Sequence, residues 1–340
     1  MSSVRVGRLL SLDFLRAFGC LGVVVNHASF LSGLSFLNQI PPFRVELFFV
    51  ISGVVAYLSL KPTSSLSSFT TKRLVRLLPL YWIATALAVL LFYVKNNSLA
   101  DTAHIISSLL LIRQPENQLG PILYQTWTLN FEIAFIAVIV ASRWMTKKYA
   151  FLIAASTILT MSCLRYKIGS YYFDYYLSQR FGMFAVGIAL GYLISTRQLL
   201  PARLALPACL LMMMVILYNG GEGYGATFVH WGIPVSMLVF SACSAEKQLA
   251  ALCIKPVTMI SKASYSIFLF HPFPIWYFQW NFSEKESIGL FTLAVIASLV
   301  IGLTVHKWIE MPLNSVLNRA VKKPDQRTAR NQAPIVQVPN

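Results

Sequence analysis

The chain alternates between long apolar stretches and short polar segments that carry most of its charge. An apolar helix needs roughly 17–25 residues to cross the hydrocarbon core of a bilayer, because each residue adds only about 1.5 Å. The pattern predicts an all-α, polytopic membrane protein with about ten transmembrane helices. The predicted spans are 9–31, 45–60, 77–94, 123–143, 149–164, 179–196, 201–218, 227–243, 264–281 and 287–309. Residues 103–112 are too short to cross and are expected to lie in the interface or to re-enter.

The basic residues between the spans predict the orientation. Ten spans put both termini on one side, and twenty of the 28 Lys and Arg residues fall on that side, seven on the other, and Arg16 within the first span. Loops rich in Lys and Arg stay in the cytoplasm, so both termini are expected there. Residues 1–312 then form one integral membrane domain, and the basic segment 313–340 is predicted to be a disordered cytoplasmic tail.

Composition agrees with this class of protein. Of the 340 residues, 56% are hydrophobic and 12% are charged, and the mean hydropathy is +0.63. The net charge of +16 comes from basic residues that lie between the apolar spans and do not cluster on a polar domain, so nucleic acid is not an expected partner. The five cysteines show neither a disulfide framework nor metal-ligand spacing, and no metal site is predicted. The first span is too long and too polar for a signal peptide, so we expect it to be retained.

The first span contains two ionisable residues, Arg16 and His27. Eleven helical residues make about three turns and rise about 16 Å, so both side chains share one face, with Arg16 toward the cytoplasmic half and His27 near the outer side. Asp13 and Cys20 lie on the same face. Ionisable groups inside a membrane are costly and indicate a functional site by default. The alternative is an interfacial Asp13–Arg16 pair with a packed histidine above it.

A basic motif, Arg73-x-x-Arg76, precedes the third predicted span, with Lys72 beside it. Its two arginines share one helix face at the cytoplasmic surface. The planar guanidinium group matches phosphate oxygens, so the motif predicts a site for a nucleotide-like donor. Anchoring to lipid headgroups is the alternative interpretation.

Two acidic residues belong to spans that begin on the outer side. Glu46 opens the second span at about the depth of His27, where it can orient the imidazole, although an acid at a helix N-terminus also favours the helix dipole by itself. Glu132 lies inside the fourth span and needs a polar partner. Trp127, near the start of that span, is otherwise an ordinary interfacial aromatic residue.

The late segment 261–276 places His271 in the middle of a predicted helix, with Ser264 and Tyr265 toward the cytoplasm. A single histidine in such a position is more often a hydrogen-bonded packing residue than a ligand. Both interpretations stay open.

Glu310 and Pro312 close the last predicted span on the cytoplasmic side. There Glu310 can pair with Arg73 or Arg76. A simple helix stop is the alternative, because proline ends helices.

Seven segments, in this order along residues 9–312, together resemble the membrane acyltransferase-3 family. They are Arg16-x10-His27, VELFFVISG at 45–53, Arg73-x-x-Arg76 with Pro79, WTLNFE at 127–132, RFGMFAVGIALGYL at 180–193, SYSIFLFH at 264–271 and the closing Glu-x-Pro at 310–312. Glu46 stands where an aspartate is frequent in that family. WTLNFE is a loosened form of a segment that is richer in serine and glutamate.

The resemblance implies a ten-helix bacterial inner-membrane enzyme, an acyl-CoA-dependent O-acyltransferase, in the form without the esterase-like domain that some members carry. Such enzymes move acetyl or other short acyl groups from cytoplasmic acyl-CoA to sugars of surface polysaccharides or related acceptors. The implied partners are membrane lipid, acyl-CoA and a glycan or lipid-linked sugar. Acyl-CoA, with acetyl-CoA first, is a co-substrate, and no bound cofactor is expected. The acyl group, the glycan and the oligomeric state are not predicted.

The resulting hypothesis divides the chemistry between two ends of a bundle. Arg73 and Arg76 hold the phosphates of coenzyme A, and the pantetheine arm runs along the Arg16 face. The thioester then meets His27, which takes a proton from the acceptor hydroxyl.

The acid that orients His27 is left open between Glu46 and Glu132. An acyl-enzyme on His27 or Cys20 is an alternative to direct transfer, although cysteine in a helix is usually packing material. The remaining expected substrate contacts are Arg16, Trp127, Tyr265 and His271.

Two other classes of protein also place charged residues inside a bundle. A transporter or polysaccharide flippase would use inverted repeats and broken helices, and the sequence shows no such repeat. A haem-binding electron carrier could use His27 and His271 as axial ligands, but the predicted topology puts them at different depths.

Overall fold

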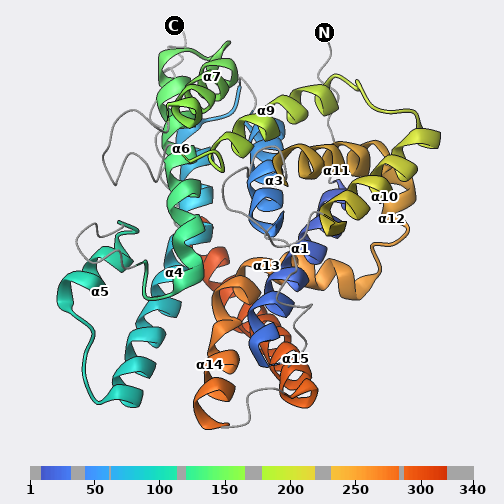
Figure 1. Ribbon diagram of the computed structural model, residues 1–340. Helices are drawn as coiled ribbons and strands as arrows, with labels where there is room; N and C mark the ends of the chain where they lie inside the picture. Colours follow the sequence, from blue (N-terminus) through green and yellow to red (C-terminus); the bar gives the residue numbers. More distant parts are fainter. Residues whose placement is uncertain are drawn as a thin grey trace, which may run out of the picture.

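The computed structural model describes residues 9–31, 43–60, 63–112, 120–164, 178–218, 231–282 and 287–319. Every regular element in these ranges is helical, so the all-α class is confirmed for the described part of the chain (Figure 1). The elements are α1 (Leu10–Ala28), η1 (Ser29–Leu31), α3 (Phe43–Ser59), α4 (Leu66–Asn96), α5 (Thr102–Leu109), η2 (Tyr124–Thr126), α6 (Trp127–Met145), α7 (Ala150–Cys163), α9 (Gly182–Ser195), α10 (Ala202–Tyr218), α11 (Ile233–Ser244), α12 (Glu246–Ala250), α13 (Lys255–Phe270), α14 (Pro272–Asn281), α15 (Ile288–Val305) and the π-helical turn η5 (His306–Glu310).

Four helical stretches are long and apolar enough to cross a membrane, as judged by length and composition. They are Leu10–Leu31, Leu66–Asn96, Tyr124–Met145 and Ile288–Arg319. Four shorter apolar helices lie at further predicted spans, namely Ala150–Cys163, Gly182–Ser195, Arg203–Tyr218 and Ile233–Ser244. The count of ten spans and the cytoplasmic termini stay predictions.

Helix α4 begins well before the predicted span 77–94, so the basic motif lies inside one 31-residue helix. Ser65 is its N-cap, and Oγ of Ser65 accepts a hydrogen bond from the backbone nitrogen of Ser68 at 3.3 Å. This is a common way to start a helix, because the first backbone N–H groups lack helical partners. The motif is therefore rigidly connected to the membrane-crossing part of α4.

The predicted span 264–281 consists of two helices, α13 and α14. His271 is the residue between them, so its expected place in the middle of a helix is wrong. Pro272 and Pro274 follow directly and deprive the preceding turn of two backbone donors. The prolines thus encode the junction between α13 and α14, which the continuous hydrophobicity of this stretch does not reveal.

The last helix runs on to Arg319. It passes Pro312 after the π-helical turn η5, so the alternative interpretation of this segment as a simple helix stop is wrong. The first residues of the predicted tail, 313–319, are helical. Residues 320–340 lie outside the described residues, and the tail itself stays a prediction.

Helix α3 lies at the centre of the bundle, in contact with α1, α9 and α11 (Figure 1). Two glycines let α3 and α9 approach backbone to backbone. A Cβ atom on Gly53 would lie 2.3 Å from the carbonyl oxygen of Phe184, and one on Gly187 would lie 2.2 Å from that of Val50. Small residues are the usual means of close helix packing in membranes. This packing fixes the side chains that α3 presents to the rest of the bundle.

Helix α1 is anchored at its start by Glu246 of α12. The Glu246 carboxylate accepts hydrogen bonds from the backbone nitrogens of Leu10 at 2.7 Å and Ser11 at 3.0 Å, which satisfies free N–H groups at the positive end of the helix dipole. Further along, Asp13 accepts a hydrogen bond from Oγ of Ser261 on α13 at 3.0 Å. These contacts set the register of α1 against α13.

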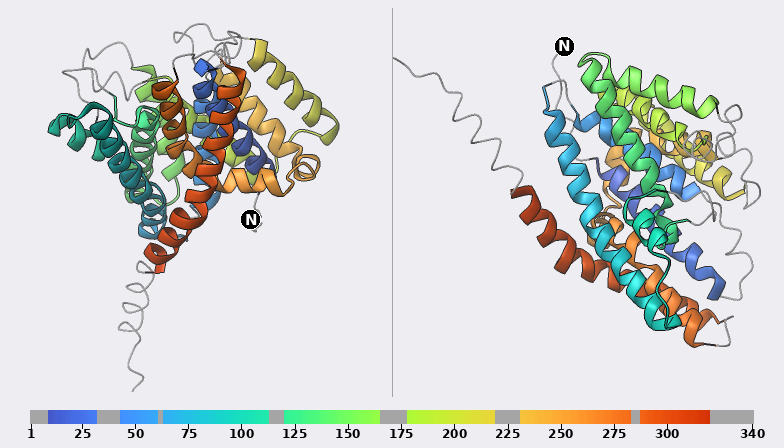
Figure 2. Two further views of the ribbon diagram at one scale, coloured as in Figure 1. Left: turned by 90° about the horizontal axis from the view of Figure 1, so that it is seen from below. Right: turned by 90° about the vertical axis from the view of Figure 1, so that its left-hand side faces the viewer.

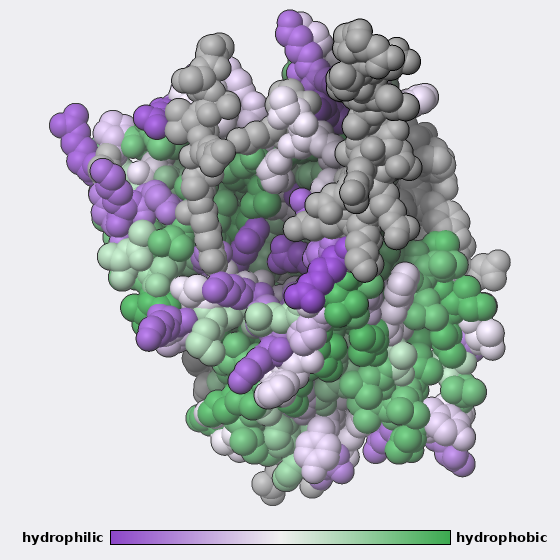
Figure 3. Space-filling view, turned by 180° about the vertical axis from the view of Figure 1, so that it is seen from behind, coloured by the Kyte–Doolittle hydropathy of each residue, from purple (hydrophilic) through white to green (hydrophobic). Residues whose placement is uncertain are grey.

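The outward faces of the long helices are apolar. In both views of Figure 2 the last helix projects beyond the bundle at its C-terminal end, and Figure 3 shows a broad hydrophobic area beside hydrophilic side chains that gather around a hollow. An exposed apolar area of this extent indicates a membrane-facing surface. Exposed apolar residues on α4 and α15 include Trp82, Leu87, Leu90, Val94, Leu293, Ile296 and Val300.

Candidate active site

A cavity of about 730 Å³ lies between α1, α3, α4, α6 and α13. Its described lining holds four cations, Arg16, Lys72, Arg73 and Arg76, against one acid, Glu132. Such an excess of positive charge, in a volume typical of ligand sites, favours an anionic small molecule. Hydroxyl groups complete the polar lining, from Ser52, Ser59, Ser64, Ser65, Ser68, Thr128, Ser264 and Tyr265.

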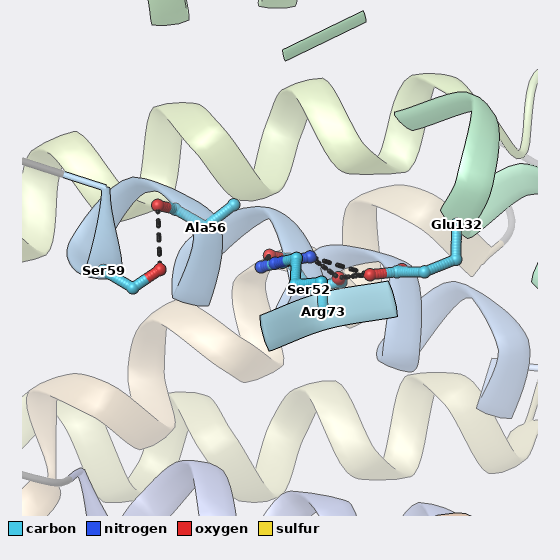
Figure 4. Close-up of polar contacts among 5 residues, drawn as sticks. All are labelled: Ser52, Ala56, Ser59, Arg73 and Glu132. Atoms are coloured by element: carbon cyan, nitrogen blue, oxygen red, sulfur yellow. Dashed lines mark hydrogen bonds and ion pairs between the residues drawn. The ribbon is translucent and has the colours of Figure 1, made fainter. Parts of the chain in front are cut away.

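Arg73 is bound to protein groups at the wall of this cavity (Figure 4). Its Nη1 lies 2.7 Å from Oε1 of Glu132 and 3.3 Å from Oγ of Ser52, which itself donates to the Glu132 carboxylate at 2.8 Å. The rings of Phe69 and Phe135 lie 4.9 and 5.9 Å from the guanidinium carbon. The ion pair is largely buried, with side-chain exposures of 16% and 17%. Glu132 thus finds the polar partner that its place in a span requires.

The other cations of the lining are not bound in this way. Arg16, Lys72 and Arg76 form no hydrogen bond or ion pair with any residue that the structure describes. Lys72 and Arg76 are exposed, so the cavity opens to the surface at this end. Charged groups that face a cavity without protein partners are available to a ligand.

Two histidines lie one helical turn beyond residues that line the cavity. Val23 and Phe268 belong to the lining, and His27 and His271 follow them along α1 and α13 without being part of it. Nδ1 of His27 lies 2.6 Å from Nε2 of His271, and the two rings stack with centroids 4.9 Å apart. We call these two residues the histidine pair.

The hydrogen bonds of the histidine pair assign its protons. Nδ1 of His271 lies 2.8 Å from the carbonyl oxygen of Phe268 and 3.1 Å from that of Ile267. A carbonyl only accepts, so Nδ1 of His271 carries the proton and its Nε2 accepts from Nδ1 of His27. Nε2 of neutral His27 is then the unprotonated, basic nitrogen. Pro272 supports this arrangement, because it has no N–H to occupy the Phe268 carbonyl.

Glu46 belongs to a separate buried cluster. Its Oε1 lies 3.1 Å from Nε of Arg180, and the Arg180 guanidinium lies 5.2 Å from the centre of the Trp127 ring. The predicted support of His27 by Glu46 or Glu132 is therefore corrected: His271 bonds Nδ1 of His27, while arginines bind both carboxylates. Trp127 and Glu46 thus share Arg180 as a neighbour. Trp127 does not line the cavity, whereas Thr128 and Leu129, which follow it on α6, do.

The structure also shows the surroundings of Tyr265 on α13 and Glu310 on the last helix. Tyr265 lines the cavity and donates a hydrogen bond to the carbonyl oxygen of Leu77 at 2.6 Å. Glu310 is buried and accepts from Oγ of Ser266 and from Nδ1 of His306, both at 2.6 Å. The expected pairing of Glu310 with an arginine of the basic motif is wrong, because these closer donors occupy it.

Two alternatives from the sequence find no support in this geometry. Sγ of Cys20 is buried, 3.8 Å from the carbonyl oxygen of Ser264, and packs against α13. A metal between two imidazoles needs about 2.0–2.1 Å to each nitrogen, and the 2.6 Å contact of the histidine pair leaves no room for it.

Three features of the site were not predicted from the sequence. Ser52 lies in VELFFVISG and Arg180 is the first residue of RFGMFAVGIALGYL. Both segments were recognised in the sequence, but no function was predicted for these two residues. Their side chains acquire one only through partners on other helices. The partnership of His27 with His271 spans 244 positions, and the proline after His271 was its only local signal.

Comparison with known proteins defines the class. A family model described as an acyltransferase domain matches residues 9–307. The chain belongs to this membrane acyltransferase-3 family, and the protein is an acyltransferase.

A relative extends the likeness over most of the chain. The exopolysaccharide production protein ExoZ of Rhizobium meliloti (strain 1021) is 27% identical over 289 residues, which are 79% of this chain and 88% of ExoZ. No solved structure matches the chain.

Proposed function

We propose that the protein transfers an acetyl or other short acyl group from cytoplasmic acyl-CoA to a hydroxyl of an extracytoplasmic or lipid-linked glycan. The observation that carries this proposal is the histidine pair, one helical turn beyond the lining of a cationic cavity. The name of ExoZ refers to exopolysaccharide production, which supports a polysaccharide acceptor. The apolar helices and the family support a place in a membrane, and we propose the bacterial inner membrane.

The donor fits the open end of the cavity by charge. Coenzyme A carries several phosphates on one side of a flexible arm that ends in the thioester. Lys72 and Arg76 are exposed and without protein partners among the described residues, so they bind the phosphates. Arg16 belongs to α1, the helix that also carries His27, and contacts the pantetheine arm. Arg73, bound to Glu132, shapes the wall of this site, and the carboxylate largely balances its charge.

We place the reaction at the histidine pair. Nε2 of His27 removes the proton of the acceptor hydroxyl while the hydroxyl oxygen bonds to the thioester carbon. When the carbon–sulfur bond breaks, the proton passes from His27 to the leaving sulfur. His271 holds the imidazole in the tautomer that this exchange requires, as the third group of a catalytic triad does. No cofactor takes part in these steps.

The test is acylation of the surface polysaccharide in living cells. A deletion strain receives the wild-type gene, His27→Ala or the control His104→Ala. His104 lies on α5, contacts the carbonyl oxygen of Gly120 and does not line the cavity. Acyl groups released by mild alkali are then quantified. We expect wild type and His104→Ala to restore acylation and His27→Ala to abolish it. Normal acylation by His27→Ala would overturn the assignment.

A further inference from the structure

A second cavity, of about 500 Å³, lies between α4, α14 and α15, at the end of the bundle where α14 lies (Figure 1). We call it the apolar groove. At its mouth Leu87 and Tyr277 are 42% and 58% exposed, whereas Phe270 and Phe278 are buried. A cavity of this kind accepts a hydrocarbon chain, because a polar ligand would find no hydrogen-bond partners on its walls. All ten described residues of its lining are apolar or aromatic, namely Leu87, Leu91, Phe270, Phe273, Pro274, Tyr277, Phe278, Trp280, Ala297 and Ile301.

The length of the apolar groove matches one leaflet of a bilayer. Phe270 and Trp280 are ten residues apart along α13 and α14, a rise of about 15 Å, and the hydrocarbon core is about 30 Å thick. The Trp280 ring stacks with that of Trp276, with centroids 6.2 Å apart, and lies 5.6 Å from that of Phe92 on α4. Indole rings usually lie at the level of the lipid headgroups. A lipid chain in the groove therefore has its headgroup beside Trp280.

A cation lies at this end of the groove. Nζ of Lys95, in the last turn of α4, is 5.7 Å from the centre of the Trp280 ring. Lys95 is exposed and forms no hydrogen bond or ion pair with any residue that the structure describes. Lysine binds phosphate as a point charge. Because a lipid chain gains little by leaving one apolar environment for another, the choice among lipids depends on the shape of the groove and on this charge.

The apolar groove and the histidine pair share one junction. Phe270 lines the groove and directly precedes His271. On α15, Ala297 lines the groove, and the next residue, Ser298, donates a hydrogen bond to the carbonyl oxygen of His271 at 3.1 Å. The His271 ring bonds to His27 of α1, whereas α4 and α15 form the walls of the groove. A lipid in the groove is thus held against the junction that carries His271 and leaves the histidine pair free.

We propose that the apolar groove binds the hydrocarbon chain of a polyisoprenyl-phosphate-linked sugar, with its phosphate at Lys95, and that this lipid-linked sugar is the preferred acceptor. The inference rests on the proposed function. Five of the ten lining residues are aromatic, and their flat, rigid faces pack against the planar double bonds of an isoprenoid chain. Binding of the chain keeps the attached sugar at a high effective concentration near His27. The same glycan without lipid stays an acceptor, with a higher KM.

The first test measures lipid binding without acyl-CoA. The purified protein is photolabelled with a polyisoprenyl phosphate that carries a diazirine, in the presence of excess unlabelled polyisoprenyl phosphate or phosphatidylglycerol. We expect label on peptides of α4, α14 and α15, and competition by the polyisoprenyl phosphate alone. Label spread over all the exposed apolar helices would overturn the proposal, as would equal competition by the two lipids.

Two tryptophan variants on α15 form a matched pair. Ala297→Trp fills the groove, whereas Ile296→Trp places the same ring at the adjacent position, which is 52% exposed and outside the lining. Ala297→Trp should raise the KM for the lipid-linked acceptor by about tenfold and leave the KM for acetyl-CoA unchanged. Ile296→Trp should behave like wild type in both. Equal KM values for the lipid-linked acceptor in the two variants would contradict the proposal.

A second pair on α4 repeats this comparison where a larger ring does not disturb the core. Leu87 and Leu90 are 42% and 57% exposed, and only Leu87 lines the groove. Leu87→Trp should weaken photolabelling by the polyisoprenyl phosphate, and Leu90→Trp should not. Equal labelling of the two variants would overturn the proposed site even if Ala297→Trp does not fold.

Lys95→Gln tests the place of the phosphate. Loss of the charge should weaken binding of the polyisoprenyl phosphate by about tenfold, while binding of the uncharged polyisoprenol stays unchanged. Lys95→Arg, which keeps the charge, should bind the phosphate like wild type. An unchanged Kd of Lys95→Gln for the polyisoprenyl phosphate would show that Lys95 does not hold it.

The two proposals fail in different ways, because photolabelling requires neither acyl-CoA nor His27. Full activity of His27→Ala would overturn the proposed mechanism whatever the labelling shows. Loss of activity in His27→Ala, together with equal labelling of Leu87→Trp and Leu90→Trp, would overturn only the lipid site.

Discussion

The open end of the cavity and the histidine pair differ in how their polar groups are bonded. At the open end, Lys72 and Arg76 are exposed and without protein partners among the described residues. In the histidine pair, both nitrogens of His271 and Nδ1 of His27 are hydrogen-bonded. The difference separates two tasks: groups that capture a mobile, charged ligand are left free, whereas groups that move a proton are held in one tautomer before the ligand arrives.

The two arginines of the basic motif repeat this contrast within one helical turn. Arg73 is bound to Glu132 and Ser52, while Arg76 faces the cavity without such partners. Identical residues three positions apart thus have different tasks. Variants that remove either the protein-bound groups or the groups without protein partners test whether these tasks are separate.

The largest effect is expected at the histidine pair. His271→Ala removes the acceptor for Nδ1 of His27, so the basic nitrogen of His27 is no longer specified, and kcat should fall by about 100-fold. His271→Gln offers a carbonyl acceptor and an amide donor in similar places and should recover part of the loss. Steady-state kinetics with acetyl-CoA measures both. A kcat for His271→Ala within about threefold of wild type would show that the pair is only packing.

A smaller effect on binding is expected at the open end. Arg76→Gln removes a charge-assisted contact to phosphate, worth about 1.5–3 kcal/mol, so the KM for acetyl-CoA should rise by about tenfold or more while kcat stays within about threefold. Calorimetry with coenzyme A measures the same loss directly. An unchanged Kd would remove Arg76 from the donor site and leave lipid headgroups as its partner.

Glu132→Gln distinguishes a structural carboxylate from a catalytic one. Loss of the ion pair with Arg73 should destabilise the protein by about 1.5–3 kcal/mol, seen as a lower melting temperature in detergent. Turnover of the folded fraction should stay within about threefold of wild type, because His271 and not Glu132 bonds His27. A drop in kcat of about 100-fold at normal stability would restore the role that the sequence suggested for this acid.

The smallest effect is expected at Ser52, which bridges the same ion pair. Ser52→Ala removes a hydrogen bond worth about 1 kcal/mol and leaves the 2.7 Å contact between Arg73 and Glu132 in place. The melting temperature should fall slightly, with kinetics unchanged. A loss as large as that of Glu132→Gln would show that the serine, and not the charge pair, orders this wall.

Periodic hydrophobicity was sufficient for the helical class and for most helix positions, because apolar length is a local property. It failed where a boundary depends on other chemistry. Polar residues hid the first turns of α4, prolines divided α13 from α14, and a π-helical turn carried the last helix past Pro312.

The sequence predicted residues of the site better than their partners. Of the nine residues expected at substrate or catalytic positions, five line the cavity, namely Arg16, Arg73, Arg76, Glu132 and Tyr265. The other four, His27, Glu46, Trp127 and His271, lie outside its lining, and the roles of all nine stay predictions. Which carboxylate meets which cation depends on how helices distant in sequence cross. Glu46 therefore pairs with Arg180, and the histidine of another helix takes the place expected for an acid.

Separation of donor binding from proton transfer is tested most directly by His27→Ala in purified, vesicle-reconstituted protein. Coenzyme A binding is measured by calorimetry, and transfer is measured with labelled acetyl-CoA and chemically deacylated polysaccharide of the producing strain. We predict a Kd for coenzyme A within about threefold of wild type and a transfer rate lower by about 10²–10⁴-fold. Transfer at more than about a tenth of the wild-type rate would contradict the assignment of His27 as the base.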